Sequence, residues 1–135
     1  MGMRYKNNPA NIRYNKKNNW LGQVGNDNGF CVFDTLEHGL RALVILLRNY
    51  INVYKLHSVS QIISRYAPSC ENDTRNYISY VNGFLRSRGV DPDDIKLNDE
   101  CLVYLGCAIC RMETNTNVFL DLSHLVPRLL SNPKK

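Results

Sequence analysis

The feature that most constrains the fold is a run of apolar residues, spaced three or four positions apart, that begins after Asp34. Residues with this spacing lie on one face of a helix. They are Leu36, Leu40, Leu43, Leu47, Tyr50, Ile51 and Tyr54. Asp34 and Glu37 have the spacing of a capping box, with Asp34 as the N-cap and Glu37 three residues into the helix. The sequence therefore predicts an amphipathic helix over 35–54.

Two shorter helices are predicted next. Ser58 and Gln61 form a second capping box. The helix that they begin must end before Pro68, because proline disfavours helical backbone at the residue that precedes it. The third helix begins with a polar cap at Asp73 or its neighbour at 72, and Gly89 ends it.

A fourth helix is predicted from a cap at Asn98 to Glu113. Asn115 can take the left-handed conformation that commonly follows the last turn of a helix. A final helical segment is expected over 121–131.

The residues before Asp34 have a different character, because asparagine and glycine dominate them. The stretch GNDNG at 25–29 is a hairpin turn signal, and the GFCVF that overlaps it reads as a short strand. We call residues 7–33 the lip and expect it to form a small β-hairpin beside a helical body over 34–131. The sequence thus predicts one α+β domain over 1–135, predominantly α, with four to five helices.

The net charge of +5 and the pI near 9.0 favour an anionic partner, such as nucleic acid, anionic lipid or a wall polymer. A nucleic-acid interface would require Arg13, Lys16, Lys17 and Arg86 on one face, and no basic stripe follows any helix. We therefore expect no nucleic-acid partner and rank that alternative third. No apolar run approaches the about 20 residues of a membrane span. The N-terminus lacks the apolar region of a signal peptide, so we expect synthesis in the cytoplasm.

Five cysteines are present: Cys31, Cys70, Cys101, Cys107 and Cys110. An odd number without a signal peptide favours reduced thiols, most of them small core residues. Cys107 and Cys110 have the spacing of a zinc or redox pair. A zinc site would need a second pair of ligands, for which only Cys101 and the distant His124 are available. We expect neither a metal nor another cofactor.

Two acids allow a catalytic as well as a structural interpretation. Glu113 lies where the fourth helix ends, so the helix dipole does not stabilise its charge, and partial burial would raise its pKa as a general acid requires. Alternatively, it is an exposed acid paired with Arg111 or a lysine. Glu71 precedes a helix start, where an acid is stabilised, or it lines a cleft.

Three blocks of sequence resemble a family of phage and prophage structural lytic proteins that has a lysozyme-like fold. They read NNPANIRYN…WLGQ…GFCVF, EHGLRALVILLRNY and IISRYAPSCENDTRNYISYV, and they cover most of residues 7–81. The middle of the chain also resembles the latter part of a soluble lytic transglycosylase. The acid helix that precedes this part in a transglycosylase is similar to LVYLGCAICRMETNTN, at the other end of this chain.

The resemblance implies a circularly permuted lysozyme-like domain with Glu113 as the catalytic acid. It implies a muramidase or lytic transglycosylase that cleaves the MurNAc–GlcNAc bond of peptidoglycan. A second carboxylate, where one is needed, would be Glu71 or Asp27. Residues that would contact sugar or peptide stem, or line the floor of the cleft, are Asn11, Arg13, Gln23, Thr74 and Tyr77. Gln23 is expected to face Glu113. Thr114 and Asn115 replace the Asn-Gly pair of the transglycosylase pattern.

The implied partner is the glycan strand of peptidoglycan, reached as a phage lysin or as a secreted antibacterial protein. Without a signal peptide, the protein would act at the wall or in the periplasm after lysis, virion incorporation or delivery by a secretion-system carrier. An inhibitor or immunity protein is a further implied partner. The main alternative is a non-catalytic virion or tail protein that binds the cell wall. In that case Glu113 would be salt-bridged or would face solvent away from any cleft.

Overall fold

The computed structural model describes residues 2–68, 73–119 and 124, and within them the fold is α+β and predominantly α. In this part of the chain, a two-stranded antiparallel hairpin precedes four helices, which confirms the expected α+β, predominantly α fold class. In chain order the elements are β1 (Gln23–Asp27), β2 (Phe30–Phe33), α1 (Leu36–Asn52), α2 (Val59–Tyr66), α3 (Thr74–Arg86) and α4 (Asp99–Thr114). The helical segment expected over 121–131 lies outside the described residues, apart from His124.

The hairpin forms at the expected turn signal. Asn28 and Gly29 connect the strands with φ angles of 56° and 91°. A two-residue turn with both φ angles positive matches the right-handed twist of the strands, and asparagine followed by glycine is its preferred sequence. Asp27 consequently pairs with Phe30 in the first rung of the ladder.

The N-cap of α1 is Thr35, so the expectation that Asp34 caps this helix is wrong. The Thr35 side chain accepts a hydrogen bond from the His38 backbone N–H. Asp34 instead lies 2.6 Å from His38 Nδ1, and this contact lowers the pKa of the Asp34 carboxyl. Threonine and aspartate are both good caps, and the shift by one residue leaves Asp34 free to reach the imidazole one turn later.

The other three helices begin at residues proposed from the sequence. Ser58, Asp73 and Asn98 each accept a hydrogen bond from the backbone N–H three residues later. In the second box, the Gln61 side chain accepts from the backbone N–H of His57. Asn115 ends α4 in the left-handed conformation, with φ 54° and ψ 43°. Local capping chemistry therefore sets these boundaries.

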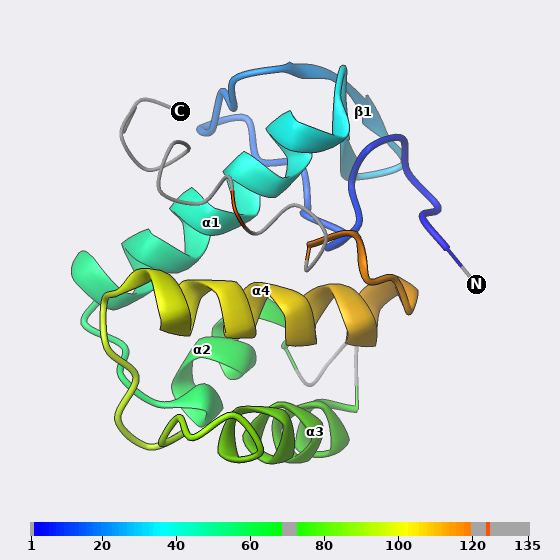
Figure 1. The fold of residues 1–135 in the computed structure, drawn as a ribbon. Helices are drawn as coiled ribbons and strands as arrows, with labels where there is room; N and C mark the ends of the chain where they lie inside the picture. Colours follow the sequence, from blue (N-terminus) through cyan, green and yellow to red (C-terminus); the bar gives the residue numbers. More distant parts are fainter. Residues whose placement is uncertain (1, 69–72, 120–123, 125–135) are drawn as a thin grey trace.

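The core forms around α4, which packs against α1 and α3, while α2 packs on α3 (Figure 1). Large side chains with no more than 1% exposure fill the space between the helices, among them Leu43, Leu47, Leu85, Leu102, Leu105 and Ile109. Each fully buried side chain of this kind contributes roughly 1.5–3 kcal/mol. Gly106 lets Phe119 approach closely, since a Cβ at that position would lie 2.5 Å from the ring.

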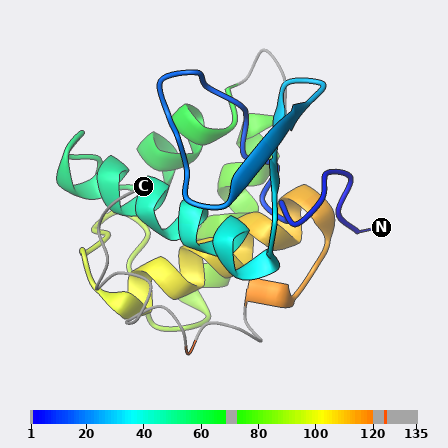
Figure 2. The same cartoon turned by 90° about the horizontal axis from the view of Figure 1, so that it is seen from above.

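The lip is anchored to this helical body rather than projecting freely. In Figure 1 it lies at the top of the molecule, and in the view from above it stands in front of the helices (Figure 2). Asn8 is fully buried, and its Nδ2 donates to the carbonyl oxygens of Ile12 and Cys31 at 3.0 and 2.9 Å. The backbone of Asn7 passes so close to Gly39 of α1 that a Cβ on Gly39 would overlap the Asn7 carbonyl oxygen. The segment before the hairpin is thus held in place on α1.

Four of the cysteines, Cys31, Cys101, Cys107 and Cys110, are buried free thiols. Burial raises the pKa of Cys31 and of Cys107 to about 11. Cys70 lies outside the described residues. Within the described part of the chain, no helix is both long enough and apolar enough to cross a membrane.

Candidate active site

Glu113 lies in the last turn of α4, next to the start of the lip. Thr114 Oγ1 donates a hydrogen bond to the carbonyl oxygen of Pro9 at 2.7 Å, and Thr114 is buried. This contact joins the C-terminal end of α4 to the beginning of the lip. The preceding residue, Glu113, therefore points its carboxylate between the lip and the helical body.

Two neutral donors orient the Glu113 carboxylate. Asn11 Nδ2 donates to Oε1 at 2.9 Å and also lies 3.3 Å from the Glu113 carbonyl oxygen. The Tyr77 hydroxyl donates to Oε2 at 2.9 Å. Arg111, the partner expected for an exposed structural acid, instead donates to Asn117 Oδ1. Of the two interpretations left open by the sequence, the contacts favour a partly buried, positioned acid.

Burial is the largest influence on the acidity of Glu113, and it raises the pKa of the carboxyl above its ordinary value. The hydrogen bonds from Asn11 and Tyr77 oppose this rise, because they stabilise the charged form. The positive charges of Arg13 and Arg4 act in the same opposing direction. A raised pKa keeps more of the acid protonated near neutral pH, and nearby donors and cations stabilise the carboxylate once its proton has left.

Asn11 has an unusual backbone conformation and a side-chain oxygen that is available to a ligand. Its φ is 53°, in the left-handed region that asparagine tolerates better than most residues. While Nδ2 binds Glu113, the amide oxygen Oδ1 is buried and has no hydrogen-bond partner among the described residues. A buried acceptor beside an acid is suited to an N–H or O–H group of a ligand.

Two tyrosines form the wall behind Glu113. Tyr77, on α3, is only 3% exposed, and burial together with the neighbouring Glu113 raises its pKa well above the usual range. Tyr66, the last residue of α2, donates its hydroxyl to the carbonyl oxygen of Ala10 and so holds the backbone next to Asn11. The Tyr66 hydroxyl thus links α2 to the start of the lip, and the Tyr77 hydroxyl, which donates to Glu113, links α3 to the end of α4.

The cavity at the carboxylate, which we call the acid pocket, has a volume of about 190 Å³. It is lined by Arg4, Tyr5, Asn11, Arg13, Phe30, Tyr66 and Glu113. Among these residues Glu113 is the only carboxylate. Asp27 is exposed at the end of β1 and does not line the pocket, and Glu71 lies outside the described residues.

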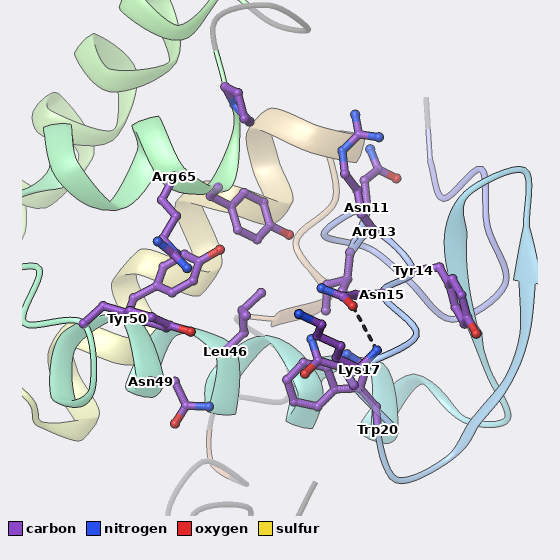
Figure 3. Close-up of a pocket in the computed structure, with 15 residues that line it drawn as sticks. Asn11, Arg13, Tyr14, Asn15, Lys17, Trp20, Leu46, Asn49, Tyr50 and Arg65 are labelled. Carbon is purple, nitrogen blue, oxygen red and sulfur yellow. Dashed lines mark hydrogen bonds between the residues drawn. The ribbon is translucent and has the colours of Figure 1, made fainter.

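A larger cavity of about 570 Å³, which we call the groove, lies between the lip and helices α1 and α2 (Figure 3). Leu46, Asn49 and Tyr50 line it from α1 and Arg65 from α2, while Lys17 and Trp20 line it from the lip. Asn11, Arg13 and Tyr66 line both the groove and the acid pocket. The two cavities therefore adjoin each other at these three residues.

Of the binding residues expected from the sequence, the structure brings Asn11 and Tyr77 to Glu113, and Arg13 to both cavities. It does not bring Gln23 or Thr74 there. The Gln23 amide oxygen lies 3.7 Å from the thiol of Cys31, and Gln23 lines neither cavity, so the expected pairing of Gln23 with Glu113 does not occur. Thr74 is buried at the start of α3 and donates to the Ala67 carbonyl oxygen at 2.7 Å, a structural contact.

Sequence reasoning missed Arg4 and Tyr66. Arg4 precedes the lip and carries no motif that could have identified it. Tyr66 offered a weak signal, since it stands beside Arg65 at the end of a predicted helix, within one of the blocks that carry the family resemblance.

Comparison with known proteins finds a phage relative. The chain is 38% identical over 117 residues to Protein P5 of Pseudoalteromonas phage PM2, and the match covers 84% of this chain and 71% of that protein. No protein-family model matches the chain.

Proposed function

The chain belongs to the family of Protein P5 of Pseudoalteromonas phage PM2, and we propose that it is a phage enzyme that cleaves the MurNAc–GlcNAc bond of peptidoglycan. The observation that carries the proposal is Glu113, a partly buried carboxyl with a raised pKa that Asn11 and Tyr77 orient toward a cavity. Glycosidic bond cleavage requires such an acid, because the leaving oxygen must be protonated as the bond breaks.

In the proposed reaction, protonated Glu113 donates its proton to the bridging oxygen while the bond from that oxygen to C1 of MurNAc breaks. Positive charge then develops on the sugar ring, as in other glycosidases. Glu113 is left as a carboxylate, which Asn11, Tyr77, Arg4 and Arg13 stabilise. The buried Asn11 Oδ1 can accept a hydrogen bond from the acetamido N–H of a bound sugar.

The residues around Glu113 favour a mechanism with a single acid. No second carboxylate lines the acid pocket or the groove in the described part of the chain. The C6 hydroxyl of MurNAc can then attack C1, and its proton passes to the Glu113 carboxylate. The products are a strand with a free GlcNAc hydroxyl and a 1,6-anhydroMurNAc end, as in a lytic transglycosylase. If water attacks instead, the product is a reducing end and the enzyme is a muramidase.

A lysozyme-like fold with permuted chain order is part of the proposal. In a transglycosylase the acid helix leads directly into the hairpin region, whereas here α4 comes last in the chain. The contacts from Thr114 to Pro9 and from Glu113 to Asn11 support the permutation, because they place the end of α4 against the start of the lip. Joining the end of α4 to the start of the lip would give the order of helix and hairpin found in a transglycosylase.

The substrate implies a site of action at the cell wall. We place synthesis in the cytoplasm of the infected cell and action at the wall after lysis or after delivery by the virion. The phage relative supports a virion or lysis context. The net charge of +5 suits a wall rich in carboxylates and phosphates.

The test is digestion of purified sacculi, followed by analysis of the released muropeptides. Glu113→Gln keeps the shape of the side chain but has no proton to donate, and we expect cleavage to fall by about 10²- to 10⁴-fold. Glu100→Gln, in the exposed first turn of the same helix, is the matched control and should cleave at the wild-type rate.

Each outcome of this digestion has a distinct meaning. Products with 1,6-anhydro ends indicate a transglycosylase, and reducing ends indicate a muramidase. Cleavage of peptide stems, or an unchanged rate for Glu113→Gln, would refute the proposed reaction. Binding of sacculi by the wild type without any cleavage would favour a non-catalytic virion protein that binds the wall.

A further inference from the structure

The groove differs from the acid pocket in its charge. Arg13, Lys17 and Arg65 line it, and no aspartate or glutamate does so in the described part of the chain. A neutral glycan backbone would not require a cavity whose charged side chains are all positive. A cavity with cations on its rim and no acids attracts carboxylates or phosphates.

Arg65 is held in a defined orientation at one end of the groove. Its guanidinium carbon lies 4.0 Å from the centre of the Tyr54 ring and 5.4 Å from that of Tyr50. Stacking on aromatic faces leaves the edges of the guanidinium group for hydrogen bonding. No carboxylate of the described residues forms an ion pair with Arg65. A guanidinium presented in this way is suited to bidentate binding of a carboxylate.

Lys17 is presented from the opposite wall by an ordered turn. Asn15 Oδ1 accepts a hydrogen bond from the Lys17 backbone N–H at 2.9 Å (Figure 3). The Asn15 carbonyl oxygen accepts another from the backbone N–H of Asn18 at 2.9 Å. The Lys17 side chain is exposed and lines the groove. The groove is thus flanked by Arg65 from α2 and by Lys17 from the lip, in addition to Arg13.

The chemistry of peptidoglycan connects this charge to Glu113. The MurNAc residue whose C1–O bond is cleaved also carries the peptide stem on its lactyl group. A stem that leaves a sugar bound at the acid pocket must therefore lie in an adjoining space. The groove adjoins the pocket through Asn11, Arg13 and Tyr66. Its asparagines can bind the amides of the stem, and its cations the free carboxylates.

We propose that the groove is a subsite for the peptide stem, in which Arg65 and Lys17 bind stem carboxylates. This inference rests on the proposed function and extends it. The enzyme requires glycan that still carries its stems, and it prefers stems with free carboxylates to amidated ones.

The test uses three substrates prepared from one batch of sacculi free of teichoic acid. The first is untreated, the second has its carboxylates amidated, and the third has its stems removed by an amidase. We expect the wild type to cleave the untreated substrate with a kcat/KM about tenfold higher than either of the others, the effect of one lost charged hydrogen bond.

Variants of groove residues test whether the groove causes the preference for untreated sacculi. Arg65→Gln should lower kcat/KM on untreated sacculi about tenfold, mainly through KM, and should leave the rates on the other two substrates unchanged. Arg65→Lys keeps the charge but loses the planar fork, so we expect an intermediate value. Arg86→Gln removes an exposed charge at the end of α3, outside the groove, and serves as the control. Thermal melting of each variant verifies that it is folded.

Failure of this inference can be distinguished from failure of the proposed function. Equal wild-type rates on the three substrates, or an equal loss on all three in Arg65→Gln, would overturn the stem subsite but leave the glycosidase intact. If no glycan is cleaved at all, sedimentation of the protein with untreated and amidated sacculi still decides the subsite. Equal sedimentation would then overturn it.

A nucleic-acid groove is the other outcome that would overturn the proposal. A labelled oligothymidylate would then bind more tightly than sacculi, and Arg65→Gln and Lys17→Gln would both lose this binding. The affinity would also fall steeply with added salt.

Discussion

Asn11 and Glu113 stand 102 positions apart in the sequence and are joined by two hydrogen bonds from a single amide group. One bond is made to the carboxylate and the other to the backbone of the same residue. The amide therefore sets both the rotamer of the acid and the position of the last turn of α4 relative to the lip. Replacing Asn11 should affect catalysis and stability through separate causes.

Asn11→Gly and Asn11→Ala separate these causes. Both variants lose the amide, and we expect cleavage to fall about tenfold or more in each, since a hydrogen bond to a charged group is lost. Only alanine must also hold a left-handed backbone, which costs about 1–2 kcal/mol. Chemical denaturation should therefore find the alanine variant less stable than the glycine variant. Asn28, with φ 56° at the exposed hairpin turn, is the matched control. Asn28→Ala should likewise be less stable than Asn28→Gly, but neither variant should change the rate of cleavage.

Tyr77→Phe should change the pH dependence of cleavage. The Tyr77 hydroxyl stabilises the charged form of Glu113, so its removal raises the pKa of this carboxyl further. Because the proposed reaction needs protonated Glu113, activity should fall as pH rises through that pKa. We expect this alkaline limb of the pH–rate profile to move to higher pH. Tyr80→Phe, exposed on the same helix, should leave the limb in place. A limb that moves to lower pH in Tyr77→Phe would mean that Glu113 is not the titrating acid.

Glu113→Gln should stabilise the protein at neutral pH. A carboxyl whose pKa is higher in the folded state binds more protons there than in the unfolded state, so stability falls as pH rises from the unfolded pKa through the folded pKa. The neutral amide avoids this loss. We expect a gain of about 1 kcal/mol at pH 7, the usual size for such substitutions. Below the ordinary pKa of glutamate the gain should vanish. Urea unfolding of wild type and variant at both pH values tests this, and an equal gain at both would point to a cause other than ionisation.

Gly39→Ala should destabilise the protein and also reduce cleavage. The added methyl group overlaps the Asn7 carbonyl oxygen, a backbone atom that moves only with the segment leading to Asn11. Overpacking of this kind costs about 1–3 kcal/mol. Gly83→Ala is the matched control, because Gly83 lies in α3 and a Cβ there meets no atom within 4 Å. This second change should stabilise the helix by about 0.5–1 kcal/mol. Thermal unfolding and sacculus digestion measure both effects.

The helix boundaries could be predicted where the signal is local. Ser58, Asp73 and Asn98 cap their helices through bonds to residues three positions away, and such patterns are visible in the sequence. The cap of α1 was misassigned by one residue because Asp34 and Thr35 are both good caps. The choice between them depends on the contact of Asp34 with His38.

The candidate site could be predicted only in part, because its contacts join remote segments. Glu113 was recognisable from its place at a helix end, and Asn11 and Tyr77 from the family resemblance. The resemblance indicates the order of the motifs but not the direction in which each side chain points. The predicted contact of Gln23 with Glu113 was therefore wrong. Tyr66 reaches the site through a hydrogen bond to Ala10, 56 positions away, and no local pattern reports such a contact.

The bond from Thr114 to Pro9 also has a consequence for the timing of activity during synthesis. A ribosome completes the lip and α1 long before it reaches Glu113. Until then the growing chain holds the walls of both cavities but has neither the proton donor nor the contact that positions it. If the proposed function is correct, truncated or stalled products therefore cannot attack the wall. The proposed site is completed in one late step, when the end of α4 packs against a segment made near the beginning.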